Sequence, residues 1–352
     1  MSWQEILRGR NAEAGIKRIT VGFDGFVDTI VRPLRQSASQ GTAAQAFSTI
    51  RQFGEFLISK AEKSCSVELA VEARQLGGNL PFLSRAAGGL GADVSCIGML
   101  GEQGMVDPLF ASMPCTLYPF APPGQSTCME FDDGKVLLAS DCTLSDEPWR
   151  LVEAATDGKA AELFRQADLL ALVNWSELSF AHALWQRVQE EIAAKEADKN
   201  RFAFFDLCDV SRKSADELDA VLRLIGRFAA YRTAILSLNE NEAQITAERL
   251  LSGQSDPVEI AQAVRAAYGI DEVIVHTIRE SVLVTPCGVT RQATEFVERP
   301  KISTGAGDNF NGAFCFATVM GLTDIDRIAF ANAFAHRYIT TGRNPTLQDM
   351  LG

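Results

Sequence analysis

The stretch KISTGAGDNFNGAF, residues 301–314, places three glycines and one carboxylate directly ahead of a run with helical spacing. Apolar side chains follow at i, i+3, i+4 and i+7 from Phe310, which predicts a helix to about Met320 with one buried face. Backbone N–H groups at a helix start have no partner within the helix, and glycine lets the chain bend without a Cβ in the way. The turn around Gly305 and Gly307 is therefore suited to hold an anion.

Asp308 stands out in this turn, because a carboxylate beside an anion site repels the ligand unless it has a task. One such task is to accept the proton of an attacking hydroxyl as a phosphoryl group arrives. The alternative is that Asp308 only caps the helix and that the glycines only permit a tight turn. The glycine spacing is not that of a dinucleotide fingerprint, and no Walker A motif occurs, so phosphate transfer would require a different fold.

The composition indicates a globular protein without a nucleic-acid partner. The 352 residues are 47% hydrophobic and 22% charged, with a formal net charge of −12 at pH 7, whereas phosphate backbones require a basic face. No apolar run is long enough to span a bilayer, and the N-terminus lacks the apolar region of a secretory signal. The eight cysteines are scattered and only three histidines occur, so no zinc site is indicated. We expect a cytoplasmic protein.

Short apolar runs rich in strand-forming residues recur along the chain, and most are continuous, as in strands covered on both faces. They are RITVGF (18–23), VSCIGM (94–99), LLALV (169–173), FAFF (202–205), AILS (234–237) and VIVH (273–276). Segments with helical periodicity lie between them, at 179–197, 214–228 and 256–269. This alternation predicts an α/β fold with a doubly wound, mostly parallel sheet flanked by helices.

Two segments interrupt the alternation and are predicted to be additions within one domain of residues 1–352. The first covers about 26–36, and the second covers 115–141 and contains the hairpin signal Asp133-Gly134 between two strand-like runs. Together they predict a small β lid. A further hairpin is expected over 281–293.

The segment STGAGDNFNGAF resembles the C-terminal signature of the PfkB, or ribokinase-like, family of carbohydrate kinases. The match covers Thr304 to Asp308 and Gly312, and it departs at Ser303, where the family has an acidic residue. The resemblance implies a ribokinase-like fold and places Thr304 near the nucleotide. It also implies a catalytic set, which is Asp308 as general base and the amides of Gly305, Ala306 and Gly307 as anion hole.

Residues 76–104, LGGNLPFLSRAAGGLGADVSCIGMLGEQG, resemble the N-terminal signature of the same family. The resemblance implies that Gly78 and Asn79 contact the sugar. The turn that follows, Gly101-Glu102-Gln103-Gly104, is one residue shorter than the family turn and has Glu in place of Asp.

The segment SLNENEAQ, residues 237–244, resembles the N-x-x-E motif of the family through Asn239 and Glu242. The resemblance implies that the two residues organise Mg²⁺ near the phosphates, with Glu242 acting through water. Such a role suits Mg²⁺, which keeps several waters and takes few protein carboxylates. The alternative is an ordinary helix start rich in Asn and Glu.

The segment VGFDGFVD, residues 21–28, lies where the first strand of the family ends in a substrate-binding Asp. Register with the strand end favours Asp24 for the sugar hydroxyls and leaves Asp28 as the second candidate.

Residues 204–218, which end a strand with Asp206, Asp209 and Arg212, resemble the family region beside the substrate and the phosphates. The resemblance implies that Arg212 balances transferred charge; the alternative is a surface ion pair with Asp209. Asn174 ends a strand and is expected in the substrate pocket or in a turn.

Residues 273–285 lie where many relatives have a glycine-rich turn under the nucleotide, and here His276 and Thr277 stand in its place. A Val-His-Thr string is similar to one in ADP-dependent sugar kinases, so ATP is the expected donor and ADP the alternative. The resemblance places Asn332 beside the adenine. It also implies a monovalent cation such as K⁺ between the anion-hole segment and the C-terminal loop, where Thr346 is a candidate ligand.

The sequence therefore predicts an ATP- and Mg²⁺-dependent kinase that phosphorylates a hydroxymethyl group of a small sugar or sugar derivative. We expect a homodimer through the lid. The alternatives are an ADP-dependent sugar kinase, a nucleoside or hydroxymethylpyrimidine kinase on the same fold, and a non-catalytic sensor of sugar or nucleotide. An intact Asp308 argues against the sensor.

Overall fold

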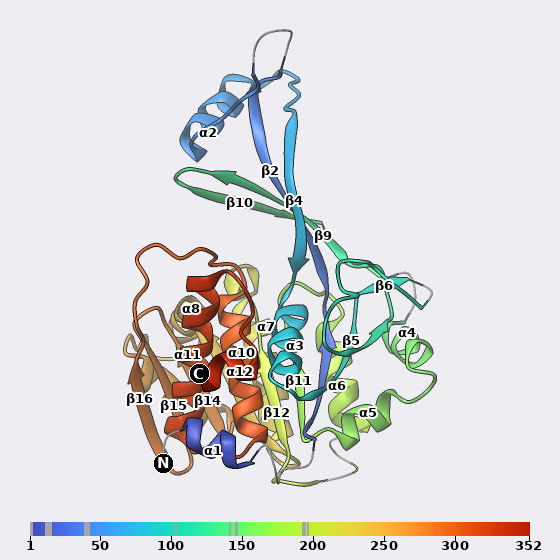
Figure 1. Ribbon diagram of the computed structural model, residues 1–352, viewed down its shortest axis with the longest axis vertical. Helices are drawn as coiled ribbons and strands as arrows, with labels where there is room; N and C mark the ends of the chain where they lie inside the picture. The colour runs from blue at the N-terminus through green and yellow to red at the C-terminus, as the bar shows by residue number, and fades with distance from the viewer. Residues whose placement is uncertain are drawn as a thin grey trace.

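A nine-stranded sheet forms the centre of the computed structural model (Figure 1). The structure describes residues 3–10, 16–38, 43–102, 104–140, 142–144, 147–191, 195 and 197–352. The strands of the sheet are β1 (Arg18–Phe23), β5 (Asp93–Gly98), β8 (Thr116–Pro119), β11 (Leu169–Leu172), β12 (Phe202–Asp206), β13 (Thr233–Asn239), β14 (Glu272–His276), β15 (Glu280–Thr285) and β16 (Gly288–Ala293).

The strand order is β16-β15-β14-β13-β12-β11-β1-β5-β8. All pairings from β14 to β8 are parallel, whereas β15 and β16 add antiparallel at one edge. The predicted doubly wound, mostly parallel sheet is therefore confirmed. The antiparallel edge is the hairpin that the sequence predicts over 281–293.

Helices cover both faces of this sheet, because strand side chains point alternately into two apolar clusters. Leu169 and Ala171 enter one cluster, and Leu170 and Leu172 enter the other. The first face carries α1 (Trp3–Arg10), α3 (Asn79–Gly89), α10 (Ala306–Val319), α11 (Asp324–Thr341) and α12 (Leu347–Leu351). The second carries α4 (Pro148–Ala155), α5 (Ala160–Gln166), α6 (Ala181–Glu191), α7 (Ala215–Phe228), α8 (Glu240–Leu250) and α9 (Pro257–Tyr268).

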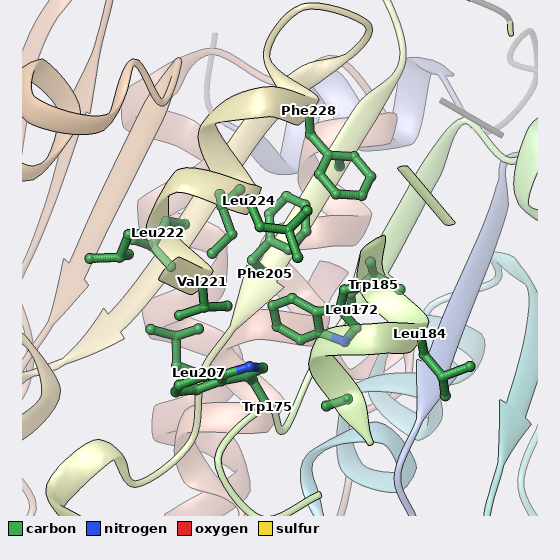
Figure 2. Close-up of a cluster of buried hydrophobic side chains, with 14 of the residues drawn as sticks. Leu172, Trp175, Leu184, Trp185, Phe205, Leu207, Val221, Leu222, Leu224 and Phe228 are labelled. Atoms are coloured by element: carbon green, nitrogen blue, oxygen red, sulfur yellow. The ribbon is translucent and has the colours of Figure 1, made fainter. Parts of the chain in front are cut away.

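Figure 2 shows part of the second cluster, where aromatic and leucine side chains from α6, α7 and β12 interlock. The helix ends follow local sequence signals. Ser214 and Glu217 form a capping box at the start of α7, and Gly269 ends α9 in the left-handed conformation, as such residues do at helix ends. No helix in these described ranges is long and apolar enough to cross a membrane.

A second, smaller sheet extends away from one end of the nine-stranded sheet (Figure 1). This small sheet contains β2 (Phe26–Gln36), β3 (Gln45–Ala46), β4 (Leu69–Gly77), β9 (Gly124–Phe131) and β10 (Gly134–Ala139). A helix, α2 (Ile50–Ser59), packs on it through a separate apolar cluster that includes Phe47, Met129 and Phe131.

The structure corrects the predicted extent of the added segments. Residues 116–119 form β8 and pair with β5 in the nine-stranded sheet, so only the part from Gly124 onward belongs to the small sheet. Asp141, at the end of that prediction, lies outside the described residues. The sequence analysis also missed β4 and α2, which complete the small sheet beside β2.

Candidate active site

The start of α10 is shaped by two glycines that lie against aromatic rings. Gly305 is the residue before the helix, at φ 76°, and a Cβ there would come within 2.7 Å of the Phe82 ring. A Cβ on Gly307 would lie 3.2 Å from the His276 ring. Neither approach is possible with a larger residue unless the ring moves. The chain therefore passes close under these rings and exposes helix-start amides.

The three amides predicted to form the anion hole are not equivalent. The Ala306 N–H donates to the Ser303 carbonyl oxygen at 3.2 Å. Within the described ranges, the amides of Gly305 and Gly307 have no protein acceptor. These two amides, rather than three, remain available to an anion.

Asp308 lies in the first turn of α10, half-buried, and does not hold the capping position, which Gly305 occupies. Its carboxylate lines a cavity of about 290 Å³. Burial raises the pKa of Asp308 well above its ordinary 3.8, and the nearby Asp206 and Asp24 raise that pKa further. A carboxylate held in this way has a higher proton affinity than an exposed one, as a general base requires.

Asp206, at the end of β12, is the centre of a hydrogen-bond network below this cavity. Its Oδ1 accepts from Asn79 Nδ2 at 3.1 Å, and its Oδ2 accepts from Asn311 Nδ2 at 2.6 Å. Asn311 in turn accepts from Ser237 Oγ at 2.8 Å. Burial raises the pKa of Asp206 to about 6. The network ties α3, α10, β12 and β13 together, and the sequence analysis did not select Asp206 or Asn311 as site residues.

Asn239 and Glu242 form a capping box at the start of α8. Glu242 Oε2 accepts from the Asn239 amide at 3.0 Å, and Asn239 Oδ1 accepts from the Glu242 amide at 3.0 Å. Burial, and then the Asp206 charge, raise the pKa of Glu242. Asn239 and Glu242 thus do form an ordinary helix start, as in the alternative interpretation. Glu242 is nevertheless buried, and it also lines the cavity.

The acidic side chains of the cavity suit a divalent cation that is held mainly through water or phosphate. Asp206, Glu242 and Asp308 line the same space. The charge of Asp206 raises the pKa values of both Glu242 and Asp308, a repulsion that a cation relieves. In the described part of the chain, no three carboxylate, imidazole or thiol groups are placed to hold a metal directly. The residues present therefore fit the indirect Mg²⁺ site that the resemblance implies.

Asp24 lies fully buried beneath the start of α3. Its Oδ2 accepts from the Asn79 amide and from Asn174 Nδ2, both at 2.8 Å, and its Oδ1 accepts from the Leu80 amide at 2.9 Å. Burial raises the pKa of Asp24 to about 7. Because protein donors occupy both oxygens, the geometry does not favour Asp24 as the ligand of sugar hydroxyls; it holds α3 and Asn174 in place.

Asp28 belongs to the small sheet and is half-buried. Its Oδ1 accepts a hydrogen bond from Ser126 Oγ of β9, and its carboxylate lies beside Gly77, where a Cβ would come within 2.4 Å. The next residue, Gly78, has φ 85°, and a Cβ there would come within 2.3 Å of Asp24. Asp28 retains accepting capacity, so the second candidate of the sequence analysis is the better placed one.

Arg212 does not reach the cavity. It lies exposed in a short 3₁₀ helix (Val210–Arg212) and donates to Glu177 at 2.6 Å instead of pairing with Asp209. Glu102 is exposed in a two-stranded hairpin, β6 (Gly101–Glu102) and β7 (Met105–Val106). Gln103 lies outside the described residues.

A second cavity of about 550 Å³ adjoins the first, and Asn239, His276 and Gly307 line both. The His276 ring contacts Phe310 at 4.9 Å between centroids, and burial lowers the pKa of this imidazole to about 4. The imidazole is therefore neutral at pH 7.

The remaining walls of the second cavity include Thr277 and Asn332. The Thr277 hydroxyl accepts from the amides of Arg279 and Glu280 and so stabilises the turn that replaces glycines. Asn332 Oδ1 accepts from Ser281 Oγ at 2.8 Å, while its Nδ2 has no partner among the described residues. An unpaired buried donor in a mostly apolar pocket is typical of a small-molecule site.

Lys135 makes a contact that the sequence analysis did not predict. It follows the Asp133-Gly134 turn of the small sheet, and its Nζ donates to Thr304 Oγ1 at 3.0 Å. The hairpin signal predicted the turn, but the partner comes from a segment 169 residues away. The small sheet therefore touches the anion-hole segment through a cation.

Comparisons with known proteins agree with this site. A model of the prokaryotic ketohexokinase family matches residues 7–351. The ketohexokinase of Haloferax volcanii is 26% identical over 345 residues, which cover 95% of this chain and 89% of that protein. The fold is similar to Arabidopsis thaliana ribokinase complexed with ribose and ATP (TM-score 0.64, 16% identity, 96% and 98% of the two chains covered). It is also similar to Escherichia coli phosphofructokinase-2 complexed with substrates and products (TM-score 0.65, 14% identity, 95% and 97% covered).

The fold and these comparisons define a carbohydrate kinase of the ribokinase-like class, an enzyme that phosphorylates a sugar, as the sequence predicts. The chain belongs to the prokaryotic ketohexokinase family.

Proposed function

We propose that the enzyme transfers the γ-phosphoryl group of ATP to a hydroxymethyl group of a ketohexose such as fructose. The observation that carries this proposal is Asp308, which lies at the start of α10 where two cavities adjoin. Asp308 accepts the hydroxyl proton, and the free amides of Gly305 and Gly307 stabilise the oxygens that gain charge. The ketohexose is the substrate class of the family and of the Haloferax relative.

The larger cavity is the proposed ATP site. Asn332 Nδ2 is positioned to donate to the base, and neutral His276 separates the base pocket from the phosphates. When bound, Mg²⁺ neutralises phosphate charge, and Asp206, Asn239 and Glu242 would hold its waters.

The sugar is proposed to lie between Asn79 of α3 and Asp28 of the small sheet. Carboxylate and amide groups can accept from and donate to neighbouring hydroxyls. Asp24 and Asn174 act indirectly, because their hydrogen bonds fix the start of α3.

We further propose that the small sheet is a lid, within a single domain, and that Lys135 holds it closed over the sugar. The contact between Lys135 and Thr304 supports this role, since closure excludes water from phosphoryl transfer.

Exposed apolar residues of the same sheet, Val71, Leu137 and Leu138, support a homodimer formed through it. A kinase that draws on cellular ATP fits the cytoplasm.

The test is a coupled assay of nucleotide turnover with Mg²⁺, which compares ATP with ADP against ketohexoses, aldoses, nucleosides and a hydroxymethylpyrimidine. We expect ATP with a ketohexose to give the highest kcat/KM, and ³¹P–¹H NMR of the product to show a phosphate on a CH₂ carbon. Preference for a nucleoside, or for ADP as the donor, would refute the proposal.

The proposed dimer is tested separately, by sedimentation of the wild type and of Leu138→Glu.

A further inference from the structure

Arg85 of α3 lies near the turn of residues 303–305, which leads into the anion-hole amides. Its Nη2 donates to Asn344 Oδ1 of the C-terminal loop at 3.2 Å, and its guanidinium lies 5.8 Å from the centroid of the Phe82 ring. Phe82 is the ring that packs against Gly305. The half-buried guanidinium is therefore one side chain away from the turn.

A hydrogen bond from α11 also holds this turn. The Tyr338 hydroxyl donates to the Thr304 carbonyl oxygen at 2.9 Å. Burial raises the pKa of Tyr338, and the charge of Arg85 acts against that rise. Arg85 itself reaches the turn through Phe82.

The family resemblance implies a monovalent cation beside this turn. The residues that this chain has there do not fit such a cation. A cation such as K⁺ needs several oxygen atoms that protein donors do not already use. Here four of the five oxygens of the turn accept hydrogen bonds, and the fifth belongs to the exposed Ser303 hydroxyl. The four are Ser303 O from the Ala306 amide, Thr304 O from Tyr338, Gly305 O from the Asn309 amide and Nδ2, and Thr304 Oγ1 from Lys135.

The C-terminal loop offers no better ligands. Thr346, the candidate of the sequence analysis, caps α12, and its hydroxyl exchanges hydrogen bonds with Asp349 at 2.9 and 3.1 Å. Asp349 in turn faces Arg337 and Arg343, each at 3.8 Å. Two guanidinium groups thus face one carboxylate, which disfavours a further cation there.

The unpaired atoms at this place agree with that charge balance. Among the buried side-chain atoms without a partner in the described residues, Arg85 Nε and Asn344 Nδ2 are both donors, and Asn309 Oδ1 is an acceptor. A single free oxygen does not make a cation site.

We propose that Arg85 supplies, from within the chain, the positive charge near the anion hole, and that the enzyme needs no monovalent cation. This inference rests on the proposed function of the turn. A fixed cation in a partly dry environment stabilises the negative charge that develops on the oxygens held by the Gly305 and Gly307 amides. Arg85 is thus a positioning residue, which acts through Phe82.

The first test uses the wild-type enzyme at constant ionic strength in KCl, NaCl or choline chloride. We expect kcat to agree within about twofold among the salts, since only general screening changes, and the melting temperature in KCl to match that in NaCl. Activation by K⁺ of about tenfold or more over choline would overturn the inference. An enzyme that turns over no sugar in any salt would instead refute the proposed function.

The second test compares Arg85→Gln and Arg85→Lys, with Arg343→Gln as the matched control on the exposed arginine of the same loop. We expect Arg85→Gln to lower kcat about tenfold with an unchanged KM for the sugar, and Arg85→Lys to recover most of that loss because the charge returns. Equal losses in both variants, in proportion to a lower melting temperature, would reduce Arg85 to a packing residue and overturn the proposal.

Discussion

The nine-stranded sheet and the small sheet follow opposite rules of burial. β11 is buried at every position, as expected for a strand covered by helices on both faces, whereas β10 is exposed at five of its six. The groups that must be held still, Asp206, Asn239 and Asp308, sit at the ends of core strands or on helices packed against them. The groups proposed to close over the substrate, Asp28 and Lys135, sit on the small sheet. The difference supports the proposal of a rigid catalytic half and a movable covering half.

The largest loss of stability is expected from a substitution of Asp24 in the rigid half. Asp24→Ala leaves three buried donors, from Asn79, Leu80 and Asn174, without an acceptor. We expect a loss of about 3 kcal/mol or more in the free energy of unfolding, measured by urea denaturation. Asp132→Ala, at an exposed ion pair of the small sheet, should change stability by less than about 0.5 kcal/mol. Equal losses of stability in Asp24→Ala and Asp132→Ala would contradict the contrast between the two sheets.

The rigid half should also lose stability as the pH rises from about 4 to 7. Burial raises the folded-state pKa of Asp24 from 3.8 to about 7 and that of Asp206 to about 6. Between the unfolded-state and folded-state pKa values, the native state binds more protons than the unfolded state. The stabilisation that results is complete below about pH 4 and is lost as the pH rises through the folded-state pKa values. Unfolding of the free enzyme across this range should show a slope that Asp24→Asn reduces. An unchanged slope in that variant would show that Asp24 titrates normally.

A smaller effect is expected from the contact between the two halves. Lys135→Met removes the hydrogen bond to Thr304 and a cation near the phosphates, so kcat should fall about tenfold while the melting temperature stays the same. Lys63→Met, at an exposed lysine between α2 and β4, is the control and should leave kcat unaltered. If both variants keep full activity, the contact has no part in closure.

The sequence predicted the rigid half well, because its strands are continuous apolar runs and its helices carry their own caps. RITVGF is β1 without a shifted boundary, and the capping residues Ser214 and Asp256 lie at the predicted helix starts. The helix and its glycine turn after residue 303 were also found, since the glycines and the apolar spacing are local signals.

The small sheet was only partly predicted, because long-range pairing decides it. β4 reads LAVEARQLG, without a clear alternation, and is a strand because it pairs with β2. The choice between Asp24 and Asp28 stays a prediction: strand register favours Asp24, but it does not show that amides of α3 bond to both oxygens of Asp24. Lys135 contacts the turn from a segment far away in sequence, so no local pattern could assign it.

The most direct test of the central claim is the turnover of Asp308→Asn with ATP and a ketohexose. The account predicts that kcat falls by about 10³-fold or more, because the attacking hydroxyl loses its proton acceptor. ATP and sugar should still bind within about threefold of wild type, and the melting temperature should not fall, because the change removes a buried charge that Asp206 repels. A variant that keeps its kcat within about tenfold of wild type would show that another group accepts the proton.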